Sequence, residues 1–113
     1  MRWLRPPTLP INLGDTIPDT WDVLSPSSAK AFTTEMRREV GPQHPLYAKR
    51  YALTVLAAAD GNDDVLLWDR SEPEQFYIMH LTWRGKPDFK PDIFPTAIAV
   101  EAADLKKALA PED

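Results

Sequence analysis

The chain has 113 residues, which fits one domain, because a second core at this length would be too small to bury itself. A hydrophobic fraction of 43%, with four Trp, four Phe and three Tyr, is enough for a buried core and argues against disorder. The 13 basic and 17 acidic residues give a net charge of −4, which argues against a general nucleic-acid binder. The absence of cysteine excludes disulfides, thiolate catalysis and Cys-based metal sites.

The N-terminal stretch 1–24 is rich in proline and shows no sustained hydrophobic period. It holds no signal-peptide core, and the chain has no run of eighteen apolar residues, so we expect a cytoplasmic protein without a membrane partner. Its apolar residues are too many for a solvated tail; they are Trp3, Leu4, Leu9, Ile11, Leu13, Ile17 and Trp21. We predict an extended arm that packs on the domain of residues 25–113 or, as a homodimer contact, on a second copy.

A helix is predicted within "SPSSAKAFTTEMRREVGP", because both of its ends are marked. Ser25 is suited to cap the N-terminus, with Pro26 at the first helical position. Gly41, followed by Pro42, is expected to provide a left-handed stop. Apolar residues recur between these ends at helical spacing, namely Ala29, Phe32, Met36 and Val40. This narrow stripe predicts that the helix covers one face of a sheet.

Three strands are predicted in "YALTVLAAAD", "VLLWD" and "FYIMHLTW", joined by turn-forming residues into an antiparallel meander. "AIAVE" is suited to a short fourth strand, and "EAADLKKALAPED" to a short C-terminal helix. The predicted fold class is therefore α+β, a single domain with a three- to four-stranded meander, an N-terminal helix and a short C-terminal helix. The face under the first helix is expected to carry Leu53, Val55, Leu67, Met79, Leu81 and Trp83.

His80 lies in the strand "FYIMHLTW", on the opposite face from this predicted core. An imidazole can act as a general base or bind a metal, but either role needs companions. The candidate catalytic residues that could act with His80 are His44, Asp63 and Asp64. The alternative, which we favour, is a half-buried structural histidine hydrogen-bonded across the strands.

Other catalytic and ligand-binding motifs are incomplete. Asp60, Asn62 and Asp64 fit the first ligand positions of a calcium loop, but Val65 stands where a glycine is required. The four glycines lie too far apart for a phosphate loop, and no serine stands in a G-x-S-x-G elbow. We therefore predict no metal and no cofactor.

The stretch "LTWRGKPDFKPDIFP" is the best candidate for recognition, because it mixes aromatic and basic residues as protein-binding surfaces do. The predicted binding residues are Trp83, Arg84, Lys86, Phe89 and Phe94. The alternative is that Trp83 and Phe94 belong to the core while the cations solvate a loop. Exposure of Phe89 would distinguish the two.

The motifs "HPLY", "NDDVLL" and "MHLTWRGK" followed by "FP" resemble small bacterial proteins in which a "DDVL" strand precedes an "HLTW" strand. The resemblance covers roughly the C-terminal two thirds of the chain. It implies a bacterial, cytoplasmic origin and gives weight to His44, Asp63, Asp64, His80 and Trp83, but it carries no catalytic assignment, since that family has no established activity.

The leading functional hypothesis is a non-catalytic binding or protein-interaction module, because no catalytic constellation is complete. An immunity-type inhibitor of a toxin is a special case, since the acidic segments "DGNDD" and "DRSEPEQ" would suit a basic surface. The alternative is a small hydrolase or metal-dependent enzyme that uses His80 with nearby acids.

Overall fold

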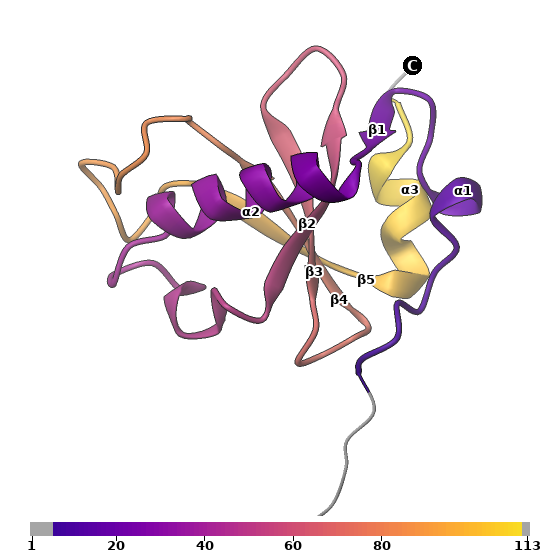
Figure 1. The fold of residues 1–113 in the computed structure, drawn as a ribbon, viewed down its shortest axis with the longest axis horizontal. Coiled ribbons are helices and arrows are strands. Elements are labelled where there is room, and N and C mark those ends of the chain that lie inside the picture. The colour runs from indigo at the N-terminus through magenta and orange to yellow at the C-terminus, as the bar shows by residue number, and fades with distance from the viewer. Residues whose placement is uncertain (1–5, 112–113) are drawn as a thin grey trace, which may run out of the picture.

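The computed structural model describes residues 6–111, which form an α+β domain around one antiparallel sheet (Figure 1). Over this range the sheet has five strands in chain order: β1 (Trp21–Val23), β2 (Leu53–Ala59), β3 (Asp64–Asp69), β4 (Gln75–His80) and β5 (Ala97–Glu101). The helices are α1 (Leu13–Thr16), α2 (Pro26–Glu39) and α3 (Leu105–Leu109), with 3-10 turns at Tyr47–Lys49 and Ala102–Asp104. Among these helices none is long and apolar enough to cross a bilayer.

The predicted α+β meander is confirmed, but the described chain has five strands instead of three or four. The additional strand is β1, which comes from the predicted arm and pairs with the end of β2, Trp21 opposite Ala59. Three residues between turns are too few to show an alternating pattern. The arm also contains the single helical turn α1, so it is not extended throughout, and Trp3 and Leu4 lie outside the described residues.

Helix α2 begins as its sequence predicts, with the Ser25 hydroxyl accepting a hydrogen bond from the Ser28 N–H at 3.3 Å. Its end differs from the prediction, because Gly41 does not adopt the left-handed conformation. The helix stops at Glu39, and Val40 is extended. Gly41 meets a different requirement, since a Cβ there would lie 2.8 Å from Pro87 Cγ. The missing side chain lets the 81–96 connection pack against the end of the helix.

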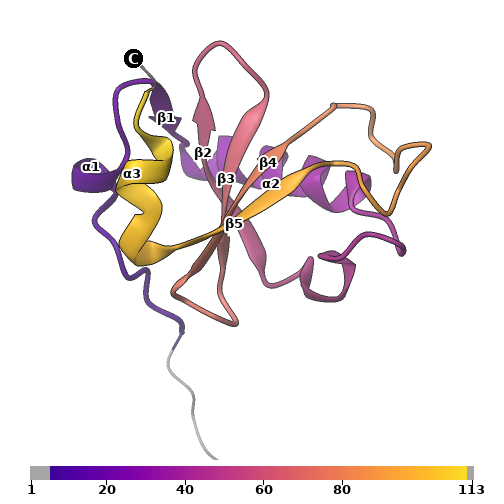
Figure 2. The same ribbon diagram turned by 180° about the vertical axis from the view of Figure 1, so that it is seen from behind.

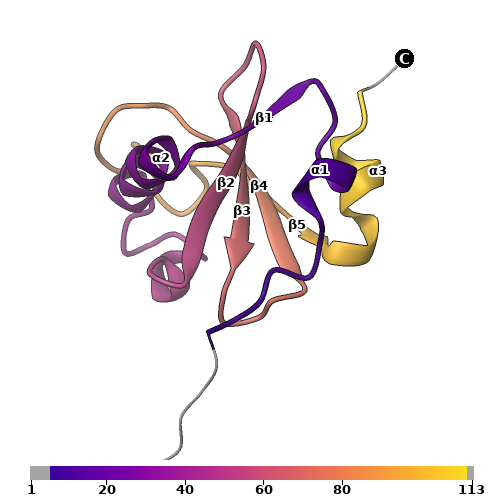
Figure 3. The same ribbon diagram turned by 45° about the vertical axis from the view of Figure 1, so that its right-hand side comes forward.

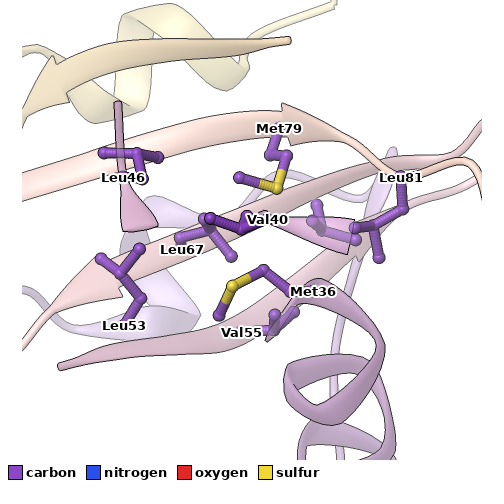
Figure 4. Packing of buried hydrophobic residues seen from close by; sticks show 9 residues of the cluster. Met36, Val40, Leu46, Leu53, Val55, Leu67, Met79 and Leu81 are labelled. Carbon is purple, nitrogen blue, oxygen red and sulfur yellow. The ribbon is translucent and has the colours of Figure 1, made fainter. Parts of the chain in front are cut away.

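The face of the sheet covered by α2 carries an aliphatic core (Figure 4). Its buried members are Met36, Val40, Leu46, Leu53, Val55, Val65, Leu67, Met79 and Leu81. The predicted core residues of this face are thus buried, with one exception. Trp83 is 46% exposed, because the chain leaves β4 after His80 and no longer alternates about the sheet.

The opposite face is covered by α3 and the arm (Figures 2 and 3). Its buried residues are Ala57, Leu66, Trp68, Phe76, Leu105 and Leu109, and the arm packs against them through Leu9, Ile11, Ile17 and Trp21. A bulge between Val55 and Ala57 breaks the alternation of β2 and turns Ala57 to this face, whereas simple alternation predicts the face of Leu53. The chain itself therefore covers the central strands on both faces of the sheet, whereas β5 stays partly exposed.

We predict that Gly41→Ala lowers the free energy of unfolding by about 1–3 kcal/mol, because the new methyl group would overlap Pro87. Urea denaturation of Gly41→Ala, Pro87→Gly and the double variant measures the coupling between the two positions. If the double variant loses as much free energy of unfolding as the two single variants combined, Pro87 is not the residue that excludes a side chain at position 41.

Candidate functional site

Residues 82–95, which make up most of the connection between β4 and β5, are here called the aromatic loop. It lies beside the C-terminal half of α2, where Figure 1 draws it in orange. Phe89 is 94% exposed, and three further large apolar side chains of the loop are exposed: Trp83, Ile93 and Phe94. A monomeric surface usually scatters such side chains singly. Their concentration in one loop makes it the first candidate for a binding surface.

The start of the aromatic loop is fastened to α2 by two buried carboxylates. Glu39 Oε1 accepts hydrogen bonds from Thr82 N at 2.7 Å and from Thr82 Oγ1 at 2.8 Å. Glu39 Oε2 accepts from Trp83 N at 2.8 Å, and Glu35 Oε2 accepts from Gly85 N at 2.8 Å. These bonds hold a sharp change of chain direction, in which Trp83 and Gly85 have φ values of 61° and 71°.

The electrostatics of this carboxylate pair are unusual. Burial raises the pKa of Glu39, and the neighbouring Glu35 carboxyl raises it further, while the hydrogen bonds from Thr82 and Trp83 act in the opposite direction. Arg38 lies 3.9 Å from Glu35 but is mostly exposed, so its charge is well screened. The net effect is a Glu39 pKa above the usual value of a glutamate.

Sequence analysis missed Glu35 and Glu39, because charged residues of an amphipathic helix are expected to face water. Each follows an apolar residue by three positions, Glu35 after Phe32 and Glu39 after Met36. Residues three apart lie on the same side of a helix. This spacing is the one sequence signal that places both acids beside the buried stripe.

Trp83 packs edge-on against Phe32 of α2, with ring centroids 4.9 Å apart and an interplanar angle of 85°. The tryptophan separates two open hollows. One, of about 270 Å³, is lined by Asp22, Leu24, Phe32, Ala58, Ala59, Asn62, Asp63, Asp64, Val65 and Trp83. The other, of about 470 Å³, lies along the outer side of α2 and reaches Lys30 and Arg38. Trp83 is thus flanked by acids on one side and by a mixed surface of Lys30, Glu35 and Arg38 on the other.

The basic residues predicted for binding lie at the tip of the loop. Arg84 pairs with Asp88 at 3.3 Å, which fixes part of its charge within the loop. Lys86 is exposed, and with Arg84 and Phe89 it lines a shallow hollow of about 230 Å³. Arg84, Lys86 and Phe89 are therefore close together in space, whereas Trp83 lines the two hollows beside α2 and Phe94 lies at the far end of the loop.

His80 and Asp64 meet, as directly opposed residues of β3 and β4. His80 Nδ1 lies 2.8 Å from Asp64 Oδ1, and both side chains are partly exposed. Asp63 and Asp64 line the acidic hollow beside Trp83, but His80 is not among its lining residues. The pair is a solvent-accessible cross-strand contact, a kind that contributes little to stability.

His44 is not brought into this pair. It is buried, Nδ1 accepts a hydrogen bond from Leu46 N at 3.0 Å, and Nε2 lies 2.7 Å from the carbonyl oxygen of Pro95. Because Nδ1 is an acceptor, Nε2 carries the proton and donates to Pro95. His44 thus fastens the far end of the aromatic loop. Within residues 6–111 no three His, Cys, Asp or Glu side chains are grouped as metal ligands.

We predict that Glu39→Gln lowers the free energy of unfolding most at acid pH and less as the pH rises. A raised pKa in the folded state means that the native protein favours protonated Glu39. The stabilisation by Glu39 is therefore fully present below the pKa of the unfolded chain, near 4.5. That contribution is lost as the pH rises through the folded pKa. Urea denaturation of both proteins from pH 4 to pH 8 measures the difference, with Glu74→Gln, at an exposed position, as control. A difference that grows with pH would contradict the raised pKa.

Comparison of the chain with protein-family models, with curated proteins and with solved structures gives no match. The resemblance to small bacterial proteins with "DDVL" and "HLTW" strands therefore stays a prediction. What can be inferred about function rests on the geometry of this chain: an anchored loop with exposed aromatic side chains, an acidic hollow beside it, and a surface Asp64–His80 pair.

Proposed function

We propose that this protein is a non-catalytic interaction module that binds a protein partner through the aromatic loop. The observation that carries the proposal is the 94% exposure of Phe89 on a loop whose two ends are fixed by buried side chains. Glu39 holds the first end and His44 holds the second. An exposed phenylalanine adds little to the core of its own domain, so its apolar surface is available to a partner.

The anchoring supports this use in energetic terms. Binding costs free energy when a mobile loop must be ordered, and a loop held by hydrogen bonds in advance avoids much of that cost. Aromatic side chains then bring a large contact area with few rotatable bonds. Trp83, Phe89 and Phe94 are such side chains, and Trp83 is further fixed by its edge-on contact with Phe32.

The chemistry beside Trp83 supports a basic partner, as an immunity-type inhibitor of a cationic toxin would require. The hollow next to the indole ring carries the carboxylates of Asp22, Asp63 and Asp64. A lysine or arginine of a partner would find there both opposite charge and an aromatic surface. Complementary charge of this kind mainly raises the rate of association, so binding would weaken as the salt concentration rises.

We predict that Phe89→Ser weakens partner binding by about 30-fold or more, the loss that defines an interface hot spot. The variant should unfold at the same temperature as the wild type, because Phe89 is exposed. A photoreactive phenylalanine analogue at position 89, introduced in the native cell, identifies the partner as a crosslinked adduct. Calorimetry with the purified partner then measures the affinity of both proteins.

The matched control is the same photoreactive residue at Ala108, an exposed position of α3 on the opposite side of the sheet (Figure 3). The proposal expects an adduct at position 89 and none at position 108. Absence of an adduct at 89, or a partner whose affinity is unchanged by Phe89→Ser, would contradict it. A partner that binds equally well at low and high salt would contradict the proposal that the partner is basic, but not the proposal that it binds the aromatic loop.

A second candidate function is a small hydrolase, which the 2.8 Å contact between Asp64 and His80 favours. Asp64 would orient the imidazole and leave Nε2 to act as a general base. We predict that any hydrolysis of ester, phosphoester or peptide substrates by the purified protein falls at least 100-fold in His80→Gln. Asp64→Asn should fall as well, whereas Asp60→Asn, in the same turn, should not. Activity that persists in His80→Gln would remove this candidate.

A further inference from the structure

The outer edge of β5 is free to pair. His80 N donates to the Thr96 carbonyl at 3.0 Å, and Ala102 N donates to the Glu74 carbonyl at 2.8 Å. In this antiparallel register the even-numbered residues 96–102 bond to β4. The N–H and C=O groups of Ala97, Ala99 and Glu101 therefore point away from the sheet. The Glu101 carbonyl is the N-cap acceptor of the 3-10 turn Ala102–Asp104, and among the residues that the structure describes none forms a hydrogen bond with the other five groups.

The side chains of β5 do not protect this edge. Natural sheets usually block a long edge with lysine, proline or a bulge. The strand Ala97–Glu101 contains none of these, and Glu101 is its single charge. Ile98 lies on the face of the sheet that α3 covers and is 65% exposed. On the other face, a hollow of about 190 Å³ opens beside Ala97 and Ala99. The sheet's other edge, β1, is only three residues long.

We propose that two copies of this chain pair through β5, antiparallel and with Ala99 opposite Ala99 of the second copy, to form one continuous sheet. The register follows from the backbone. A partner strand must offer its own outward-pointing groups, so residues 97, 99 and 101 have to oppose the same set. Only the arrangement with Ala99 on the two-fold axis gives all three of them a partner within the strand.

The side chains fit this register. Ile98 lies opposite Val100 of the second copy, so two β-branched residues meet on the face that α3 shares, and the exposed part of Ile98 is covered. Glu101 lies opposite Ala97, so no like charges face each other. The inference goes beyond the proposed function, because Phe89 is outside β5 and each copy would keep its own aromatic loop.

A single introduced cysteine tests the register, because the natural chain has none. Opposed residues of a hydrogen-bonded antiparallel pair have Cα atoms about 5.5 Å apart, within the range of a disulfide. Ala99→Cys should therefore form a covalent dimer on mild oxidation. Ala97→Cys is the matched control on the same edge, since its counterpart would lie four residues along the strand, about 13 Å away. Equal crosslinking of the two variants, or none, overturns the proposed register.

Sedimentation velocity over a concentration series tests the dimer itself. As the protein concentration rises, the wild type should sediment increasingly as a dimer. Ala99→Pro should remain a monomer, because proline lacks the outward-pointing N–H, whereas the pairing with β4 does not use that N–H. Ala99→Thr keeps the donor and should dimerise. Thermal unfolding verifies that each variant is folded. If Ala99→Pro does not fold, the crosslinking of Ala99→Cys and Ala97→Cys tests the dimer in its place. A wild type that is monomeric throughout, or a dimer that survives Ala99→Pro, overturns the proposal.

Phe89→Ser should dimerise as the wild type does, which distinguishes this interface from the surface of the aromatic loop.

Discussion

Two carboxylates that face into the protein determine the shape of its most exposed segment. Glu35 and Glu39 lie one helical turn apart on α2, and together they accept four hydrogen bonds from Thr82, Trp83 and Gly85. Burying acids is costly, and the raised pKa of Glu39 reflects that cost. The compensation is that three backbone N–H groups of a sharp bend have partners in part-buried hydrogen bonds.

The consequences of this anchor extend along the whole loop. Trp83 adopts its left-handed backbone conformation where its N–H meets Glu39, and its ring then rests on Phe32. Farther along, Pro87 packs on Gly41, and Pro95 receives a hydrogen bond from His44. Both ends and one intermediate point of the aromatic loop are thus fixed to the region around the end of α2. Phe89 projects from a supported segment instead of a free one.

Local patterns are sufficient to predict most of the fold from the sequence. Ser25 and Pro26 mark the start of α2, and alternating apolar residues mark β2 and β4. The features that escape prediction depend on contacts between distant residues. The bulge at β2 depends on pairing with β3, β1 depends on the end of β2, and the role of Gly41 depends on Pro87. No window of neighbouring residues contains that information.

The candidate site divides in the same way. The loop is predictable, because aromatic and basic residues between prolines are a local signal, and the opposition of Asp64 and His80 follows from pairing two consecutive strands. The buried acids of α2 cannot be predicted in this way, because an amphipathic pattern assigns charged residues of a helix to the solvent side. Asp69 is another such case: burial by itself raises its pKa, but hydrogen bonds from Lys49 and Ser71 outweigh burial and lower it.

The second core, on the face of α3, joins the two ends of the described chain. Leu66 and Phe76 are covered from one side by Ile17 and Trp21 of the arm and from the other by Leu105 and Leu109. During synthesis on the ribosome, the α2 face can close as soon as Leu81 has emerged, whereas the opposite face stays partly open until α3 follows. The arm precedes the strands that it covers, so this face can receive part of its apolar cover from the chain's beginning and the remainder from its end.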